Sequence, residues 1–244
     1  MINNILILAA GEGVRLLPLT SDIPKPLLEI DEGNTTILDR LFQQCRRYLP
    51  GISIKINVGF CAEKILIHFK DTPYMDRPIF LYEKDILGPA QTLVQLSSIN
   101  EGKTLVIHGD LVLSDEGFSK FVDFAETAES QLIVCHERPR SMARSEVIYS
   151  GNIKKMERII EFPLKGNDSQ TGSNNNVLVS SGIFIIDLSK VSSFRAEPNQ
   201  SLSPDLLNFI NDEKMDIYLW DDWRYAIDSV ATLQEARLKL SSKI

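Results

Sequence analysis

The sequence predicts an α/β protein with a doubly wound, mostly parallel sheet and a small β-rich insertion. Apolar, strand-like runs alternate with amphipathic, helix-like segments as far as residue 137, which favours parallel strands joined by right-handed crossovers. Beyond residue 137 the pattern changes to strand-like runs separated by polar turns. No repeat with a period of about 20–50 residues is visible, so one α/β domain with an insertion is the simplest account of the 244 residues.

The first 137 residues predict strands and helices in alternation. The helix at 35–48 has apolar residues at helical spacing, and the threonines at its start can cap it. Strands are predicted at 4–11, 53–60, 78–83, 103–110 and 131–137, and further helices at 62–69, 88–98 and 115–127.

The remaining residues predict a different arrangement. Residues 146–162 indicate a hairpin whose turn falls at 150–152. The polar stretch at 165–176 is rich in Gly, Asn and Ser, and predicts a loop or a mobile lid. A strand is predicted at 177–187, and helices at 203–212 and 229–240.

The composition excludes several classes of protein. A formal net charge of −7 argues against nucleic-acid binding, so any anionic ligand must be held by local features. No apolar run reaches about 18 residues, so no membrane-spanning helix is expected, and the apolar N-terminal stretch is too short for a signal peptide. The three cysteines match no disulfide or zinc spacing, which predicts reduced thiols in a cytoplasmic protein.

The segment GEGVRLLPLTSDIPKP, residues 11–26, places a glycine turn and two cations directly after the first predicted strand. Such a turn is a common anion site, because its backbone N–H groups point at the ligand. Pro24 and Pro26 restrict the backbone around Lys25, which holds that lysine on a stiff segment. The dinucleotide fingerprint fails at Leu16, and no Walker A Gly-Lys-Ser/Thr is present. A surface loop with unrelated cations is the alternative interpretation, and the grouping behind a buried strand favours an anion site.

The longer run LAAGEGVRLLPLTSDIPKP resembles the sugar-1-phosphate nucleotidylyltransferase family, whose pattern is LAAG-x-G-T-R-[LM]-x-P-x-T-x-x-x-P-K-P. Only Val14 departs from it, where the family has threonine. The resemblance implies that the family's arginine and lysine, which act on the phosphates, are Arg15 and Lys25. It implies nucleotide-binding positions at Leu8, Ala10, Gly11 and Gly13.

The resemblance also implies a fold, a reaction and a cofactor. The fold would be a single Rossmann-like nucleotidyltransferase domain over residues 1–244, with a nucleotide-binding half at 1–137 and an acceptor-binding half at 138–244. A sugar 1-phosphate oxygen would attack the α-phosphorus of an NTP and pyrophosphate would leave, with Mg²⁺ as the cofactor. Positioning and charge stabilisation dominate such transfers.

Two aspartates are the expected metal ligands. Asp110 ends a predicted strand, at the edge where ligands of parallel sheets bind, and the family carries Gly-Asp there. His108 is expected to be structural, because magnesium prefers oxygen ligands. The stretch DDWRYAIDSVATLQEA at 221–236 resembles the family's W-x-D-I-G-T-P-E-D-L. The usual aspartate falls on Ala226, and Asp228 is the expected ligand, with a helix cap as its alternative role.

The base is expected to meet YEKDILGPAQTL at 82–93, which resembles the family's E-x-x-x-L-G-T-A-G-A-L. Gly88 would let the backbone approach the ring, and Glu83 would contact the base. A carboxylate accepts two N–H bonds and guanine offers such a pair, which favours GTP. Relatives with glutamate here that use UTP leave that base open.

The acceptor half departs further from the family. ERIIEFP at 157–163 resembles F-x-E-K-P, which places a sugar-binding glutamate at Glu161, but Phe162 replaces the lysine that holds the sugar phosphate. The charge would come from Lys165 or from Lys154/Lys155, or the acceptor would be unusual. VSSGIFII resembles V-N-A-G-I-Y-V-F and predicts substrate-binding residues at Ser181 and Gly182.

Two other functions stay open at this point. Phe162 and Ala226 are compatible with a cytidylyltransferase for phosphocholine or another small phosphate ester. Together with Val14, they are also compatible with a non-catalytic regulatory subunit that binds a nucleotide-sugar. The sequence leaves the sugar and the oligomeric state open, a homo-oligomer included.

Overall fold

The structure is a computed structural model that describes residues 1–72, 74, 77–86, 88–143, 145–150, 155–161, 176–191, 194 and 215–242. These residues form a nine-stranded sheet, β3-β2-β1-β4-β9-β6-β10-β8-β7, and a two-stranded sheet of β5 and β11. The strands are β1 (Asn4–Leu8), β2 (Ser53–Val58), β3 (Ile79–Tyr82), β4 (Lys103–His108), β5 (Leu111–Leu113), β6 (Leu132–Pro139), β7 (Ser145–Ser150), β8 (Lys155–Glu161), β9 (Asn176–Asp187), β10 (Asp216–Leu219) and β11 (Arg224–Ala226).

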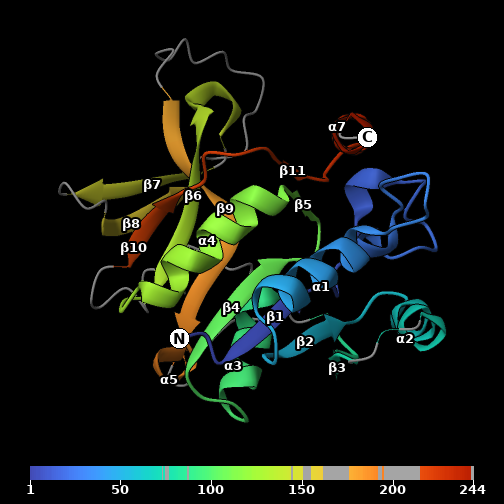
Figure 1. The fold of residues 1–244 in the computed structure, drawn as a ribbon, viewed down its shortest axis with the longest axis horizontal. Coiled ribbons are helices and arrows are strands. Elements are labelled where there is room, and N and C mark those ends of the chain that lie inside the picture. Colours follow the sequence, from blue (N-terminus) through green and yellow to red (C-terminus); the bar gives the residue numbers. More distant parts are fainter. Residues whose placement is uncertain are drawn as a thin grey trace.

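Helices connect and cover these strands. In Figure 1, β2, β3 and α2 lie at one end of the large sheet and β7, β8 and β10 at the other, while α1 and α4 cross in front. The described helices are α1 (Ile37–Tyr48), α2 (Ala62–Asp71), α3 (Pro89–Ser97), α4 (Asp115–Thr127), α5 (Leu188–Val191) and α7 (Val230–Ser241), with short 3-10 helices η1 (Val14–Leu16), η2 (Lys25–Leu27) and η3 (Arg140–Met142).

The central strand β1 shows why the sheet is covered on both faces. Successive side chains of a strand point to opposite faces. Ile5 and Ile7 of β1 pack in the core formed with α1, α2, α4 and α7. Leu6 packs in the second core, with α3 and α5. Because β1 pairs in parallel with both β2 and β4, the predicted α/β class with a doubly wound, mostly parallel sheet is confirmed.

The sheet is mixed beyond β4. β9 runs antiparallel between β4 and β6, so the strand predicted at 131–137 does not lie beside the one predicted at 103–110. The predicted hairpin is confirmed as the antiparallel pair β7–β8. Its turn at 151–152, most of the predicted loop at 165–176 and the helix predicted at 203–212 lie outside the described residues.

Side-chain caps mark the start of the helices that frame the site. Thr36 accepts a hydrogen bond from the Asp39 N–H, and the Asp39 carboxylate accepts one from the Thr36 N–H, which closes a capping box at the start of α1. Ser229 and Thr232 form the corresponding pair at the start of α7. The predicted capping of the helix at 35–48 is therefore confirmed.

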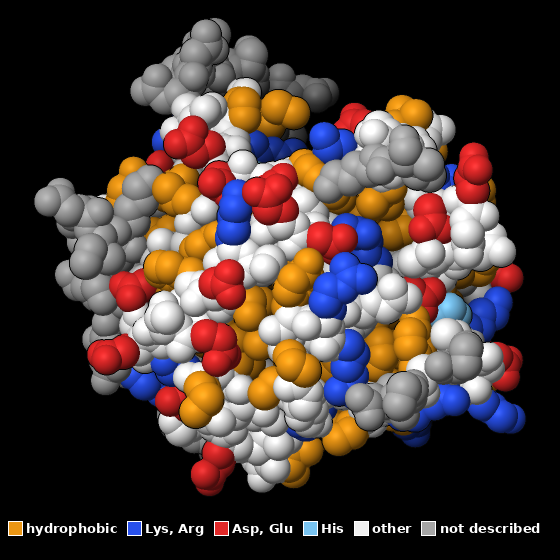
Figure 2. Space-filling model, in the orientation of Figure 1, with side chains coloured by type: hydrophobic (Ala, Val, Ile, Leu, Met, Phe, Trp, Pro, Cys, Tyr) orange, Lys and Arg blue, Asp and Glu red, His pale blue; other side chains and the backbone are white. Residues whose placement is uncertain are grey.

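Charged side chains of both signs are spread over the face of the molecule that Figure 2 shows. Figure 2 shows acidic and basic side chains interspersed on the visible face, with hydrophobic side chains between them.

No helix within the described ranges is long and apolar enough to cross a membrane. The three cysteines are free, and two of them, Cys45 and Cys135, are buried.

Candidate active site

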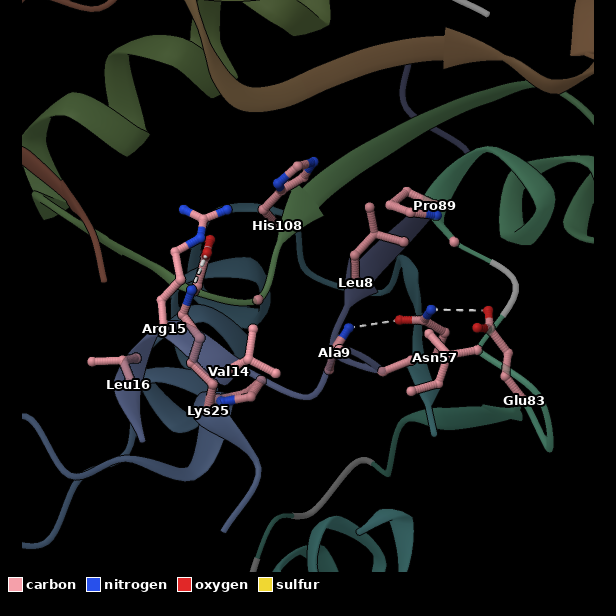
Figure 3. Close-up of a pocket in the computed structure, with 18 residues that line it drawn as sticks. Leu8, Ala9, Val14, Arg15, Leu16, Lys25, Asn57, Glu83, Pro89 and His108 are labelled. Carbon is pink, nitrogen blue, oxygen red and sulfur yellow. Dashed lines mark hydrogen bonds and ion pairs between the residues drawn. The ribbon is translucent and has the colours of Figure 1, made fainter. Parts of the chain in front are cut away.

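A pocket of ≈ 280 Å³ opens where β1 and β4 end. The chain turns away from these two neighbouring strands in opposite directions, which creates the crevice in which ligands of doubly wound sheets bind. Figure 3 shows Arg15, Lys25 and His108 at one end of the pocket and Asn57 and Glu83 at the other, with Ala9 between them. The lining residues are Leu8, Ala9, Ala10, Gly11, Gly13, Val14, Arg15, Leu16, Lys25, Pro26, Asn57, Glu83, Ile86, Gly88, Pro89, His108, Gly109 and Asp110.

The glycine turn after β1 is built around the backbone of Gly13. Its φ of 66° lies in the left-handed region, and an added Cβ would approach the Lys25 Cβ to 3.1 Å. The Thr20 hydroxyl donates a hydrogen bond of 2.9 Å to the Gly13 carbonyl. The turn and the start of η2 therefore pack as one unit, which holds Lys25 against the glycine segment.

A second glycine allows β1 and β4 to end close together. The Gly109 N–H donates to the Leu8 carbonyl at 2.8 Å, and a Cβ at this position would lie only 2.6 Å from that oxygen. Asp110 follows directly. The close approach of the two backbones thus explains why glycine precedes the aspartate and places its carboxylate beside the turn after β1.

Each cation at this end of the pocket contacts a carboxylate. Lys25 Nζ lies 2.6 Å from Asp110 Oδ2, and Arg15 Nη1 lies 3.6 Å from Asp228 Oδ2. Burial alone would raise the pKa of Asp110, but the charge and hydrogen bond of Lys25, together with smaller contributions from His108 and the backbone, lower that pKa and keep the carboxylate ionised. The structure thus brings Arg15, Lys25, Asp110 and Asp228 together. Arg15 and Asp228 are more than 200 residues apart in the sequence.

Asp228 reaches the site through the small sheet. β11 pairs with β5, Ala226 lies opposite Leu111, and the Ile227 N–H donates to the Asp110 carbonyl at 2.9 Å. The residue that caps α7 is Ser229, so the alternative role of Asp228 as the helix cap is wrong. Asp228 is half-exposed and faces Arg15 instead.

The opposite end of the pocket is organised by Asn57, which the sequence analysis missed. Its side-chain oxygen accepts from the Ala9 N–H at 2.6 Å, and its amide donates to Glu83 Oε1 at 3.0 Å. The Thr92 hydroxyl also donates to Glu83 Oε1. The only available signal was a polar residue near the end of the strand SIKINV, in which Ser53 and Lys55 are also polar.

Glu83 keeps one oxygen free at this end. The side chain is 5% exposed, and its Oε2 is buried without a hydrogen-bond partner. An unpaired buried acceptor is costly unless a ligand supplies a donor. Gly88, with a φ of 87°, lies at the start of α3 beside it and also lines the pocket.

Ser181 and Gly182, which the sequence predicted to bind the acceptor, are not among the residues that line this pocket. Ser181 is buried and its hydroxyl lies 3.0 Å from His136 Nδ1, while Gly182 packs against the His108 ring. Burial lowers the pKa of His108, which agrees with a structural role. The backbone of Glu161 lies in β8 opposite Ser145, but the described residues do not include its side chain, nor the side chain of Lys155, nor residues 154, 162 and 165.

The donor groups fit a hard cation that is shared with a ligand. Asp110 and Asp228 offer carboxylate oxygens from adjacent segments, and Mg²⁺ commonly takes one or two carboxylates together with substrate phosphates. Among the described residues, no group of three or more His, Cys, Asp or Glu could hold a metal by itself.

Comparison with known proteins agrees with this geometry. Residues 4–219 match the family described as nucleotidyl transferase. The bifunctional protein GlmU of Methanococcus aeolicus is 34% identical over 111 residues, which cover 46% of this chain and 25% of that protein. The mannose-1-phosphate guanyltransferase of Yarrowia lipolytica is 26% identical over 194 residues, which cover 77% of this chain and 52% of that protein.

Solved structures share the fold. The UDP-glucose pyrophosphorylase from Acinetobacter baumanii superposes with a TM-score of 0.81 at 17% identity, over 100% of this chain and 94% of that one. The chain spans a quarter to about half the length of the two curated relatives above. Since the family match covers most of the chain, the resemblance seen in the N-terminal motif is confirmed, and the chain belongs to the nucleotidyl transferase family.

Proposed function

We propose that this protein transfers a nucleotidyl group from an NTP to a sugar 1-phosphate, with Mg²⁺, and releases pyrophosphate. The observation that carries the proposal is the meeting of Arg15 and Lys25 with Asp110 and Asp228 at the open ends of β1 and β4. Two cations and two carboxylates suit a reaction in which both substrates are anions and a metal ion is shared with them.

The reaction needs little covalent chemistry from the protein. An anionic oxygen of the sugar 1-phosphate attacks the α-phosphorus of the NTP and forms the new P–O bond. The bond from the α-phosphorus to the bridging oxygen breaks, its electron pair leaves with pyrophosphate, and no proton has to be abstracted. The turn at Gly11 and Gly13 binds the triphosphate, Arg15 contacts it, and Lys25 stabilises the charge on the α-phosphoryl group.

The paired charges explain how the site accepts its ligands. Without substrate, Asp110 and Asp228 neutralise Lys25 and Arg15. We infer that phosphates take over the cations and that the two carboxylates are then free to hold Mg²⁺. The ion, when bound, supplies positive charge against the phosphate oxygens.

GTP is the nucleotide that we propose. Glu83 Oε2 is a buried acceptor without a partner at the far end of the pocket, and guanine presents N–H donors. We also propose that residues 1–137 bind the nucleotide and residues 138–244 the acceptor, with Glu161, Ser181 and Gly182 on the acceptor side, in a protein of the cytoplasm.

A panel of substrates tests the proposal. The chain is incubated with Mg²⁺, each of the four NTPs and either a sugar 1-phosphate or phosphocholine, and pyrophosphate release is followed. We expect release with a sugar 1-phosphate, and loss of release in Asp110→Asn. Turnover confined to CTP and phosphocholine would overturn the sugar assignment. Nucleotide-dependent thermal stabilisation without any turnover would instead show a binding subunit.

A further inference from the structure

The side chain of Arg224 lies in the acceptor half, between three strands. It extends from β11, and its Nη2 donates to the Ser181 carbonyl of β9 at 3.1 Å. Its Nη1 lies 3.2 Å from Nδ1 and 3.0 Å from Nε2 of His136 in β6. Its Nε is buried and has no hydrogen-bond partner. The guanidinium therefore has an unused donor, and the groups within hydrogen-bond distance of it are an imidazole and a backbone carbonyl.

No carboxylate pairs with Arg224 among the residues that the structure describes. Burial and the nearby Arg224 and Arg138 together lower the pKa of His136 to about 3, so this imidazole is neutral near pH 7. Burial and Arg138 lower the pKa of Arg224, and Asp110 raises it; the net pKa of about 10 still leaves the guanidinium charged. Arg224 is half-buried without a paired anion among the described residues, which is costly for a cation. Lys25 and Arg15, in contrast, each have a carboxylate.

Arg224 also lies close enough to Asp110 to be affected by its charge. Ala226, which lies two residues after Arg224 in β11, pairs with Leu111, the residue that follows Asp110. The field of Asp110 reaches Arg224 and partly offsets the effect of its burial. The next residue after Ser181, Gly182, packs on His108 at the end of β4. The guanidinium thus lies on the side of Asp110 that faces the predicted acceptor residues, and Arg224 is half-buried rather than sealed.

We propose that Arg224 binds the phosphate group of the acceptor, in the place of the lysine that Phe162 replaces. The proposal rests on the proposed function, because it assigns a residue to the second substrate of that reaction. Arginine presents a rigid fork of N–H donors that matches two phosphate oxygens. His136 and the Ser181 carbonyl hold the guanidinium in position.

The test separates the acceptor from the nucleotide. Steady-state kinetics are measured with the sugar 1-phosphate varied at saturating NTP, and NTP binding is measured separately by calorimetry without acceptor. For Arg224→Gln we expect the KM for the acceptor to rise roughly 10- to 100-fold, while the Kd for the NTP changes less than about twofold. Inorganic phosphate is also tested as a competitive inhibitor against the acceptor. Its inhibition constant should rise by a similar factor in Arg224→Gln.

Two further variants provide the controls. Arg224→Lys keeps the charge but loses the fork, so its acceptor KM should lie between those of the wild type and Arg224→Gln. Arg138→Gln removes a charge from the exposed end of β6, close enough to affect the pKa of both His136 and Arg224. If Arg224 acts by direct contact with the phosphate, and not through the overall positive charge of this region, the acceptor KM of Arg138→Gln should stay within about twofold of the wild-type value.

The outcomes distinguish this proposal from the proposed function. Absence of turnover in the wild type with every NTP and acceptor refutes both. Normal turnover with an unchanged acceptor KM in Arg224→Gln refutes the phosphate site alone, as does an equal weakening of acceptor and NTP, which a purely structural role would produce. If Arg224→Gln does not fold, Arg224→Lys decides, and an unchanged acceptor KM in that variant overturns the proposal.

Discussion

The side of the candidate active site that we propose to bind the nucleotide and the side that we propose to bind the acceptor, called here the nucleotide side and the acceptor side, balance their charges differently. On the nucleotide side, Lys25 and Arg15 are each matched by a carboxylate at 2.6 Å and 3.6 Å. On the acceptor side, Arg224 is packed between a neutral imidazole and a backbone carbonyl. The first side can exist without substrate at little electrostatic cost, whereas the second holds a positive charge for which the described residues provide no paired anion.

The two sides also differ in how they are encoded. The nucleotide side comes largely from one continuous run, residues 8–26, whose spacing is readable. The acceptor side is assembled from β6, β9 and β11, and Arg224 meets His136 across 88 residues of sequence. Short-range motifs therefore mark the first side, and only strand pairing brings the second together.

The largest effect is expected at the paired cation of the nucleotide side. Lys25→Ala removes the charge beside Asp110, and we expect kcat for pyrophosphate release to fall roughly 10²–10³-fold, the usual loss for one electrostatic contact to a transition state. Lys64→Ala is the matched control, because Lys64 forms an exposed ion pair with Asp22 at 3.3 Å. A similar loss in both variants would contradict a specific role for Lys25.

A second prediction concerns Asp39, whose carboxylate caps the start of α1 and does not line the pocket. Burial alone would raise the pKa of Asp39, but hydrogen bonds from His68, Tyr74 and Thr36 lower it from 3.8 to about 2. Because the pKa is lower in the folded protein, the stability that it contributes is present above about pH 4 and is lost as the pH falls towards 2. Its contribution is about 2 kcal/mol at neutral pH.

Urea unfolding of the wild type and Asp39→Asn measures this contribution. We expect the difference in unfolding free energy between the two proteins to shrink as the pH falls from 6 to 3. NTP binding at pH 7 should be unchanged in the folded variant. A difference that does not depend on pH would show that the hydrogen bonds to Asp39 do not act through its charge.

The glycine turn gives a smaller effect that joins stability to binding. Gly13→Ala places a Cβ 3.1 Å from Lys25 Cβ at a φ of 66°, and we expect a loss of about 1–2 kcal/mol in unfolding free energy together with weaker NTP binding. Gly51→Ala has a φ of 79° but nothing within 4 Å of the added Cβ. It should lose stability from backbone strain alone and keep its NTP affinity, as read by urea unfolding and calorimetry.

The smallest effect concerns the choice of base. Glu83→Gln replaces an acceptor by a group that both donates and accepts, and we expect the ratio of kcat/KM for GTP to that for UTP to fall about tenfold. The acceptor KM should not move, since Glu83 lies at the end of the pocket away from Arg15, Lys25 and His108 (Figure 3). An unchanged ratio would show that Glu83 does not contact the base.

Much of the fold was predictable because its signals are local. The strand-helix alternation, the capped helix at 35–48 and the hairpin follow from hydrophobic period and turn residues close in sequence. The position of β9 between β4 and β6 was not predictable. A run of apolar residues does not specify which strands it pairs with, or whether it pairs in parallel or antiparallel. Asn57 could not be distinguished from the other polar residues of its strand, Ser53 and Lys55, because its role depends on three partners that are distant in sequence.

The amino-acid sequence by itself determined the glycine turn, the stiff segment around Lys25 and the aspartate at the end of β4. Backbone conformation and motif spacing are properties of neighbouring residues. Only the tertiary structure decided that Asp228 faces Arg15, that Ser229 caps α7, and that Arg224 lies between His136 and Ser181. These contacts depend on hydrogen bonds between distant strands, above all β5 with β11 and β9 with β4 and β6, whose partners no short stretch of chain specifies.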